Sequence, residues 1–259
     1  MKSIADACAD GRIDGRIAVV VGNFADSPAL ARAAELGIPI ATVKSPSASA
    51  EPHASEIYGK TLLDVIQSHG VELVCLAGYI RKIPGEVIEQ FPGRIMNIHN
   101  ALIPSFCGKG MYGMNVHQAA VDYGVKVSGC TVHFVDEGYD TGPIIMQSTV
   151  PVYAEDTAED VSARVLVAEH DTYWRAINLF AQGRLKIDGR KVSIANAGSP
   201  PHPLPEGERQ EEDAQRLPAV ESPAHPQASS IQAPVATGDG LRTEAPRTGA
   251  PGLETLWDA

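Results

Sequence analysis

Short apolar runs alternate with helical patterns along the first three quarters of this chain, and this alternation limits the possible folds most strongly. The run 17–21 (IAVVV) is rich in β-branched residues and is followed by Gly22 and Asn23, which is typical of a buried strand. The segment 28–36 begins with proline and is followed by glycine, as many helices are. Further strand patterns cover 40–44, 72–78, 94–99, 126–135 and 143–152, further helical patterns cover 53–69, 84–90 and 157–182, and a closing hairpin is predicted at 184–194.

Strands that are apolar along their whole length are buried on both faces. The alternation therefore predicts an α/β, Rossmann-like protein with a mostly parallel, twisted sheet flanked by helices. Ligands of such sheets bind outside the carboxyl ends of the strands. The segments that follow the strands at 72–78, 94–99 and 126–135 are therefore the first places to look for a site.

The composition changes near residue 198. From Ser199 onward the chain holds 10 of its 19 prolines, and ten acidic residues against four basic ones. Such a segment buries too little apolar surface to offset the entropy lost on ordering. We therefore expect one domain over 1–197 and a disordered, Pro-rich acidic tail over 198–259.

Charge and cysteine usage exclude several classes of partner. The net charge is −11 and no basic cluster stands out, which argues against nucleic acid and anionic membranes as partners. Four cysteines, at positions 8, 75, 107 and 130, have neither metal-site nor disulfide-framework spacing, which favours free thiols. No run approaches the ~20 apolar residues of a membrane span, and the chain opens without a signal-peptide pattern. We expect a cytoplasmic protein without a bound metal.

Polar residues gather where the predicted strands end. Asn97 and His99 are two positions apart on one strand, so their side chains point to the same face. An amide can donate a hydrogen bond to an oxygen that becomes negative, and an imidazole can move a proton near neutral pH. Asp140 follows the next strand, and its carboxylate could orient the imidazole and favour the protonated form. These three residues are the candidate catalytic group.

Each of these residues also has a plainer interpretation. Asn97 and His99 could form a turn or a cap, and the acidic residues at 136–140 could form a solvated loop. His133 alternates with apolar neighbours and is more typical of a hydrogen-bonded structural histidine than of a metal ligand. His117 is expected on a helix that frames the cleft. A metal site is disfavoured because no histidine pair has ligand spacing.

Four segments of the chain together form a specific combination: LAGYIRKI (76–83), FPGRIMNIHNALIPSF (91–106), GCTVHFVDEGYDTGPIIMQ (129–147) and ARVLVAEHDTYWRAI (163–177). They resemble the glycinamide ribonucleotide formyltransferases, in the order seen in that family and over about residues 4–187. The family transfers a formyl group from 10-formyltetrahydrofolate to the amino group of glycinamide ribonucleotide, a step of purine biosynthesis. The resemblance implies that fold and activity, small-molecule substrates, no metal, and a monomer or homodimer.

The resemblance assigns roles to individual residues. Asn97 is expected to polarise the formyl oxygen, and His99, held protonated by Asp140, to stabilise the oxyanion and to serve in proton transfer. Glu169 matches a glutamate that binds the glycinamide substrate. The folate is expected to contact Asn97 and two loops, one holding the pterin through its backbone and one lining the pocket, which here are Ile80, Arg81, Lys82 and Ile83, and Asp136, Glu137, Gly138, Tyr139 and Asp140.

The chain departs from the family pattern at its beginning. Met1 falls just after the loop that holds the substrate phosphate at a helix N-terminus in the family. We therefore expect the family's first strand and that loop to be missing, and the segment 1–16 to match the helix that follows them. The neighbouring strands would then lack backbone partners.

Three further departures lie inside the chain. Asn100 stands where the family commonly has proline, which leaves the backbone φ free. The longer segment Cys107–Asn115 is either a lid or substrate loop, in which Lys109 contacts a phosphate, or a plain surface insertion. No basic residue in 45–58 matches an arginine that often contacts folate in the family.

Two alternatives to formyl transfer stay open. The first is formyltetrahydrofolate deformylase, a hydrolase with a related catalytic domain, which PSF (104–106) and HQA (117–119) fit fairly well. LAGYIRK (76–82) fits the transferase better, and deformylases carry an extra domain ahead of the catalytic one. The second alternative is an inactive folate-binding remnant, which the expected loss of the phosphate loop motivates.

Overall fold

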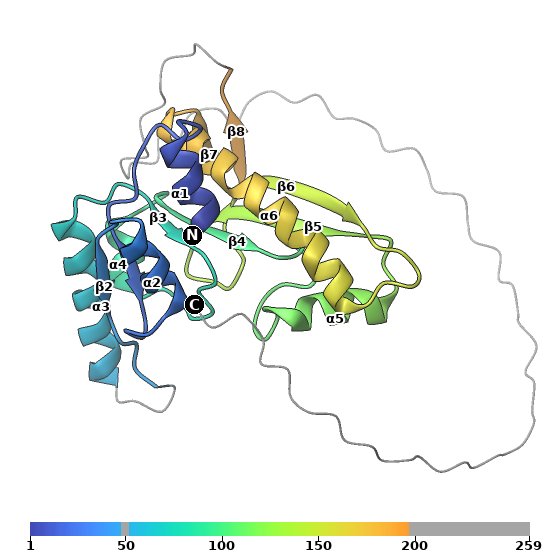
Figure 1. The fold of residues 1–259 in the computed structure, drawn as a ribbon, viewed down its shortest axis with the longest axis horizontal. Coiled ribbons are helices and arrows are strands. Elements are labelled where there is room, and N and C mark those ends of the chain that lie inside the picture. Colours follow the sequence, from blue (N-terminus) through green and yellow to red (C-terminus); the bar gives the residue numbers. More distant parts are fainter. Residues whose placement is uncertain (48–51, 197–259) are drawn as a thin grey trace, which may run out of the picture. The chain divides into compact units, whose positions relative to one another are not determined.

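Helices and strands alternate along the part of the chain that the structure, a computed structural model, describes (Figure 1). That part comprises residues 1–47 and 52–196, all in one unit of the chain, so the predicted tail at 198–259 lies outside it. The helices are α1 (Lys2–Ala9), α2 (Pro28–Glu35), α3 (Pro52–Ser68), α4 (Gly85–Gln90), α5 (Met114–Tyr123) and α6 (Ala158–Ala181). The strands are β1 (Val20–Gly22), β2 (Ile40–Thr42), β3 (Val74–Leu76), β4 (Ile95–His99), β5 (Val127–Phe134), β6 (Ile144–Pro151), β7 (Leu185–Asp188) and β8 (Lys191–Ile194).

The described strands form two sheets. β1 pairs only with β2, in parallel, and the other six strands follow the order β3-β4-β5-β6-β8-β7. β3 is parallel to β4, whereas β5 runs antiparallel to both β4 and β6. The α/β class is confirmed, but the larger sheet is mixed rather than mostly parallel. The turn at 135–143 between β5 and β6 is too short for the crossover of about a dozen residues that a parallel pair requires.

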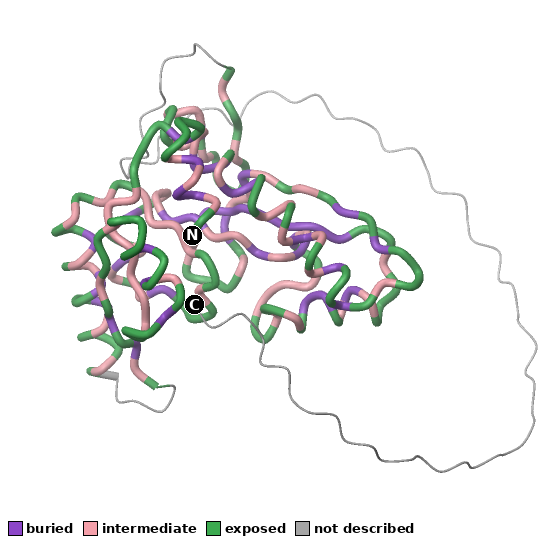
Figure 2. The backbone as a smooth tube through the Cα atoms, viewed as in Figure 1, coloured by how far each residue is buried: buried purple, intermediate pink, exposed green. Residues whose placement is uncertain are grey.

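Helices cover both faces of β4, and the alternation of its side chains shows how. Met96 is fully buried in an apolar cluster with Ile4 of α1 and Ile177 of α6. Its neighbour Ile95 packs in a second cluster with Leu62 of α3 and with residues of α4. Successive side chains of a strand point to opposite faces, so α1 and α6 lie on one face and α3 and α4 on the other. Figure 2 shows the buried residues along the central strands and the inner sides of the helices.

The start of α6 is fixed by a capping box. The Thr157 hydroxyl accepts a hydrogen bond from the Asp160 N–H at 3.2 Å, and the Asp160 carboxylate accepts one from the Thr157 N–H at 2.9 Å. A defined first residue sets which side chains of the helix face inward. Val161 and Val165 lie on this inner side. Both are fully buried in a third apolar cluster with Cys130 of β5.

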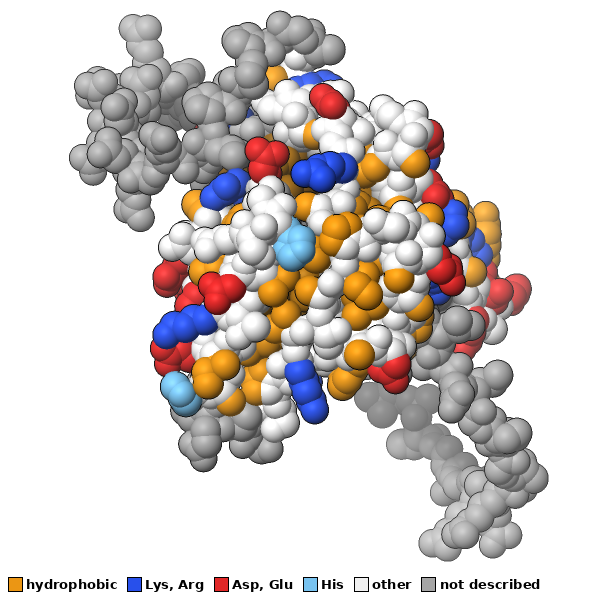
Figure 3. Space-filling view, turned by 60° about the vertical axis from the view of Figure 1, so that its left-hand side comes forward, with side chains coloured by type: hydrophobic (Ala, Val, Ile, Leu, Met, Phe, Trp, Pro, Cys, Tyr) orange, Lys and Arg blue, Asp and Glu red, His pale blue; other side chains and the backbone are white. Residues whose placement is uncertain are grey.

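The surface carries apolar, basic and acidic side chains. Figure 3 shows apolar side chains near the middle of one face, with Lys and Arg scattered among acidic residues around them. No helix in the described ranges is long and apolar enough to cross a membrane. All four cysteines are free thiols.

The packing of α6 gives a matched pair of substitutions for stability. Val165→Ala should lower the free energy of unfolding by about 2 kcal/mol, because two buried methyl groups are lost and a cavity is left. Val167→Ala, on the same helix but 71% exposed, should change it by less than about 0.5 kcal/mol. Urea denaturation followed by circular dichroism measures both. Equal effects of the two changes would contradict the assigned inner face of α6.

Candidate functional site

Four polar side chains share one face of β4 and β5. In the antiparallel register Asn97 lies opposite His133, and His99 lies opposite Thr131. Residues directly opposite in such a pair point to the same side, so all four gather there. The residues between them on each strand are apolar and pack on the side of α6. The two strands therefore separate a polar face from an apolar one.

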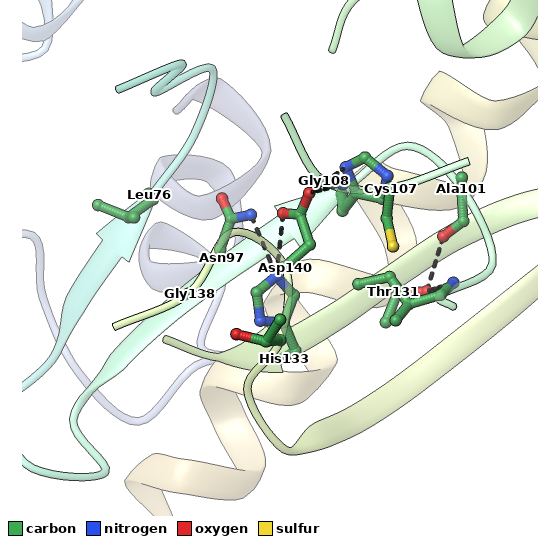
Figure 4. Close-up of polar contacts among 12 residues, drawn as sticks. Leu76, Asn97, Ala101, Cys107, Gly108, Thr131, His133, Gly138 and Asp140 are labelled. Carbon is green, nitrogen blue, oxygen red and sulfur yellow. Dashed lines mark hydrogen bonds and ion pairs between the residues drawn. The ribbon is translucent and has the colours of Figure 1, made fainter. Parts of the chain in front are cut away.

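The first interaction on this face joins Asn97 to His133 (Figure 4). His133 Nδ1 lies 2.7 Å from the Phe134 carbonyl oxygen and must donate to it, since a carbonyl only accepts. In the neutral ring His133 Nε2 is then an acceptor, and Asn97 Nδ2 donates to it at 3.2 Å. This contact fixes the orientation of the Asn97 amide. The second N–H of the amide has no protein partner in the described part of the chain and can donate to a bound oxygen.

The Asp140 carboxylate lies between the two histidines. Its Oδ2 is 3.8 Å from His99 Nδ1 and accepts a hydrogen bond from the Gly108 N–H at 2.9 Å, while its Oδ1 is 3.7 Å from His133 Nε2. Burial by itself would raise the pKa of Asp140. The neighbouring His133, the hydrogen bond from the Gly108 N–H and the nearby His99 outweigh it, so the pKa lies below its ordinary value.

The backbone at Asp140 is unusual. Its φ is +55°, in the left-handed region that residues with a side chain rarely adopt. The turn from β5 to β6 starts beside Met96, at the far end of β4 from His99. The chain must therefore fold back over the polar face for Asp140 to reach His99. Strained backbone of this kind often accompanies a functional side chain.

Both ring nitrogens of His99 face a protein group. Nε2 lies 2.9 Å from the Phe106 carbonyl oxygen and donates to it, and Nδ1 faces Asp140. Burial lowers the pKa of His99 most strongly, and His133 also lowers it, while Asp140 and the Phe106 carbonyl raise it. The net pKa lies below its ordinary value. The expectation that Asp140 holds His99 protonated is therefore corrected: Asp140 acts in the predicted direction, but the ring is only 6% exposed and burial outweighs it.

The segment 101–113 contacts the site at several points. Thr131, fully buried, donates to the Ala101 carbonyl at 2.7 Å and accepts from the Ile103 N–H at 3.1 Å. Phe106 and Gly108 contact His99 and Asp140, as described above. Within the Cys107–Asn115 segment Gly108 makes one of these contacts, which favours a lid or substrate loop over a plain surface insertion. Lys109 is exposed within the same loop.

The two predicted folate-binding loops lie in irregular, mostly exposed segments. Ile80 and Arg81 make no backbone hydrogen bond among the described residues, so their N–H and C=O groups are open to a ligand, whereas Ile83 is buried in the core. In the second loop the Asp136 carboxylate accepts from the Gly138 N–H and the Thr141 hydroxyl, so it holds the turn. The exposed members of the two loops are Ile80, Arg81, Lys82, Glu137, Gly138 and Tyr139.

Glu169 lies apart from the catalytic candidates. It is on α6, beside Cys130 on the apolar side of β5, and no hydrogen bond or ion pair joins it to Asn97, His99 or Asp140. Burial raises its pKa to about 7. No charged or hydrogen-bonding partner in the described ranges offsets that burial. A half-buried carboxyl with a raised pKa is a candidate for ligand binding.

Sequence reasoning missed two members of the polar face. His133 was expected to be a hydrogen-bonded structural histidine, which it is, but its partners Asn97 and Asp140 were not foreseen. Thr131 was not singled out at all. Only the register of β4 on β5 reveals either role. In the described residues no group of three or more His, Cys, Asp or Glu side chains is placed to hold a metal ion.

The balance at His99 can be tested by removing Asp140's charge. Asp140→Asn should lower the pKa of His99 further, because the main influence that raises it is lost while burial stays. NMR titration of the histidine ring protons measures this shift. A His99 pKa that rises in the variant would contradict the arrangement.

The raised pKa of Glu169 has a consequence for stability. An acid whose folded pKa of about 7 exceeds its unfolded value destabilises the fold increasingly as the pH rises from about 4.5 through 7. Glu169→Gln should therefore be more stable than the unsubstituted chain at pH 8, by about 1–3 kcal/mol, with little difference below pH 4. Urea denaturation at both pH values tests this. A variant that is less stable at pH 8 would show that Glu169 has a favourable partner.

Comparison with known proteins places this geometry in a family. The model of the family described as formyl transferase matches residues 1–177. A chloroplastic phosphoribosylglycinamide formyltransferase of Arabidopsis thaliana is 42% identical over 185 residues, which cover 71% of this chain and 62% of the relative. The enzyme of that name from Haemophilus influenzae is 36% identical over 187 residues, which cover 72% of this chain and 84% of the relative. The chain thus spans less than two thirds of the plant relative's length.

Solved structures agree with the sequence relatives. Glycinamide ribonucleotide transformylase 1 from Symbiobacterium toebii superposes with a TM-score of 0.68 at 45% identity, covering 75% of this chain and 88% of that one. A formyltetrahydrofolate deformylase from Burkholderia mallei superposes with a TM-score of 0.65 at 28% identity, covering 75% and 65%. By the matched model, the relatives and the fold, the chain belongs to the formyl transferase family and is similar to its phosphoribosylglycinamide formyltransferases.

Proposed function

We propose that this chain transfers a formyl group from 10-formyltetrahydrofolate to the amino group of glycinamide ribonucleotide. The observation that carries the proposal is the convergence of Asn97, His99 and Asp140 on one polar face of β4 and β5. The two substrates are inferred from the relatives named phosphoribosylglycinamide formyltransferase and from the family resemblance of the sequence. 10-Formyltetrahydrofolate itself supplies the one-carbon group. The residues of this chain therefore have to bind the two substrates, polarise the formyl group and transfer protons.

Asn97 and His99 would act on the formyl oxygen. The unpartnered N–H of Asn97 can donate to that oxygen as the substrate amine forms a bond to the formyl carbon and the oxygen gains negative charge. His99 donates through Nε2, which in the described state is directed at the Phe106 carbonyl. As the bond from the formyl carbon to the folate nitrogen breaks, the proton lost by the amine must reach that nitrogen, and His99 is placed to pass it on, directly or through water.

Asp140 would stabilise the transient positive charge on His99. His99 is neutral in the described state because burial dominates, so a proton that it receives during the reaction is held by the carboxylate 3.8 Å away. An imidazole can take and give a proton near neutral pH, and the Asp140 carboxylate favours the form that has taken it.

Groups of the two loops are suited to binding the folate. The open backbone groups of Ile80 and Arg81 can pair with the donors and acceptors of a pterin ring, and the exposed ring of Tyr139 borders the second loop. Tyr58 and Tyr79 share a hydrogen bond of 3.1 Å near the first loop, and Arg81 donates to the Pro46 carbonyl at 2.9 Å. The Tyr79 hydroxyl also donates to the Lys82 carbonyl at 3.3 Å, so these contacts hold the loop in place while leaving the backbone groups of Ile80 and Arg81 open.

Hydrolysis of the same formyl donor is the competing function. The likeness to a deformylase structure favours it, and both reactions would use the same polar face. They differ in the acceptor, water instead of the amine of glycinamide ribonucleotide. A folate-binding chain without activity is the second competitor, and it predicts binding of tetrahydrofolate without turnover.

The test follows both products with the full chain. Purified protein and 10-formyltetrahydrofolate should give formylated glycinamide ribonucleotide when the acceptor is present, and little formate when it is absent. His99→Asn and Asn97→Ala should each lower kcat/KM by about 10²–10⁴-fold, since each removes proton transfer or oxyanion stabilisation. His53→Asn, a matched change at an exposed histidine on α3, should leave kcat/KM unchanged.

Three outcomes would overturn the proposal. Rapid formate release without acceptor would establish the hydrolase. Tight folate binding with neither product would establish the inactive binder. Equal activity of the His99→Asn and His53→Asn variants would show that the reaction does not use the polar face.

A further inference from the structure

The Asn100 side chain ties together the two ends of the loop that covers the site. Asn100 directly follows His99, and its Nδ2 donates to the Gly113 carbonyl at 3.0 Å, at the other end of the loop. The same Nδ2 lies 3.0 Å from Nε2 of His117, one turn into α5. One amide therefore connects the end of β4, the end of the loop and the first turns of α5.

The contacts of Asn100 fix the position of the proton on His117. A carbonyl only accepts hydrogen bonds, so the nitrogen of the Asn100 amide must face Gly113. That nitrogen also faces His117 Nε2, which therefore accepts, and the His117 proton sits on Nδ1. Nδ1 is buried and has no partner among the described protein atoms. His117 is only 3% exposed, so its buried ring serves Asn100 as an acceptor and, once protonated, would oppose the amide hydrogens.

Other contacts hold the beginning of the loop but not its end. Thr131 and Gln147 bind the backbone of Ala101 and Ile103. Beyond Gly108 the hydrogen bonds from the loop to the rest of the described fold are that of Asn100 to Gly113 and that of Asn115 to the Gly110 carbonyl at 3.3 Å. The end of the loop thus depends mainly on Asn100.

Between these two ends lie the carbonyl of Phe106 and the N–H of Gly108. The first accepts from His99 Nε2 and the second donates to Asp140 Oδ2, both at 2.9 Å. A shift of the loop end would move both groups together. The orientation of the His99 imidazole and the position of the Asp140 carboxylate therefore both depend on this loop.

We propose that Asn100 is a positioning residue for the reaction: with His117 as its acceptor, it closes the loop 101–113 so that Phe106 and Gly108 hold His99 and Asp140 in their working geometry. The role in turnover rests on the proposed function, whereas the positioning itself can be observed without it. The charged and titratable groups that face His99 are Asp140 from the β5–β6 turn, His133 from β5 and His117 from α5.

Two substitutions of Asn100 and one matched control test this role in the full chain. Asn100→Ala removes the amide, and Asn100→Asp keeps its shape but can no longer donate to Gly113 or to His117. Asn115→Ala removes an amide that also binds one loop carbonyl but touches neither Gly113 nor His117. The readouts are nitrogen NMR of the histidine rings, the titration of His99, turnover and the melting temperature.

The expected results separate positioning from simple stabilisation. In the unsubstituted chain His117 should carry its proton on Nδ1. Both Asn100 variants should raise the His99 pKa toward its ordinary value, because a loosened loop relieves the burial that lowers it. They should also lower kcat by about tenfold or more, since misplaced catalytic groups lose rate steeply. Asn115→Ala, which removes the longer hydrogen bond at 3.3 Å, should change both readouts much less than either Asn100 variant does.

Several results would overturn the proposal. A proton on Nε2 of His117 in the unsubstituted chain would contradict the contact itself, even if both variants failed to fold. Variants that lower only the melting temperature, with His99 titration and kcat unchanged, would make Asn100 a structural residue. If Asn100→Asp behaved like the unsubstituted chain, the donated hydrogen bonds would have no role. If the unsubstituted chain transferred no formyl group, the proposed function would fail, while the histidine measurements would still decide the positioning.

Discussion

The antiparallel register of β4 on β5 is the constraint on which the rest of the site depends. It places Asn97 opposite His133 and His99 opposite Thr131, so that these four polar side chains lie on the same side. A slip by one residue would turn these side chains into the apolar clusters beneath α6, where each would lose its partners at about 1–3 kcal/mol apiece. The packing of Met96 and its apolar neighbours against α6 thus specifies the register, and the register specifies the polar face.

On that face, burial and charge act on His99 in opposite directions. Asp140 raises the pKa of His99 and burial lowers it, and burial is the larger influence. Asp140 itself stays ionised more easily than usual because His133 lies beside it and the Gly108 N–H donates to it. The described state therefore pairs a neutral imidazole with an ionised carboxylate. In the proposed reaction this pair can accept a proton and stabilise it, which a permanently charged imidazole could not do.

Local patterns were sufficient to predict the helices, the strands and the identity of the catalytic candidates. The runs of β-branched residues, and Pro28 at the start of α2 with Gly37 after its end, act within a few residues of themselves, so they can be recognised without tertiary information. The direction of β5 could not be recognised in this way, because an apolar strand looks the same in a parallel and in an antiparallel pair. The same limit hid the roles of Thr131 and His133, which exist only through pairing with β4.

The pKa of His99 was misjudged for a related reason. The charge of Asp140 can be foreseen once the two residues are placed near each other, but the extent of burial depends on the loop 101–113, whose path follows from Asn100, Thr131 and Gln147. The loop also supplies the Phe106 carbonyl that accepts from His99 Nε2. Under the proposed function the formyl oxygen would replace that carbonyl as the acceptor. Exchanging one carbonyl oxygen for another at the same N–H changes the free energy little, so the loop can hold the ring ready without opposing the binding of substrate.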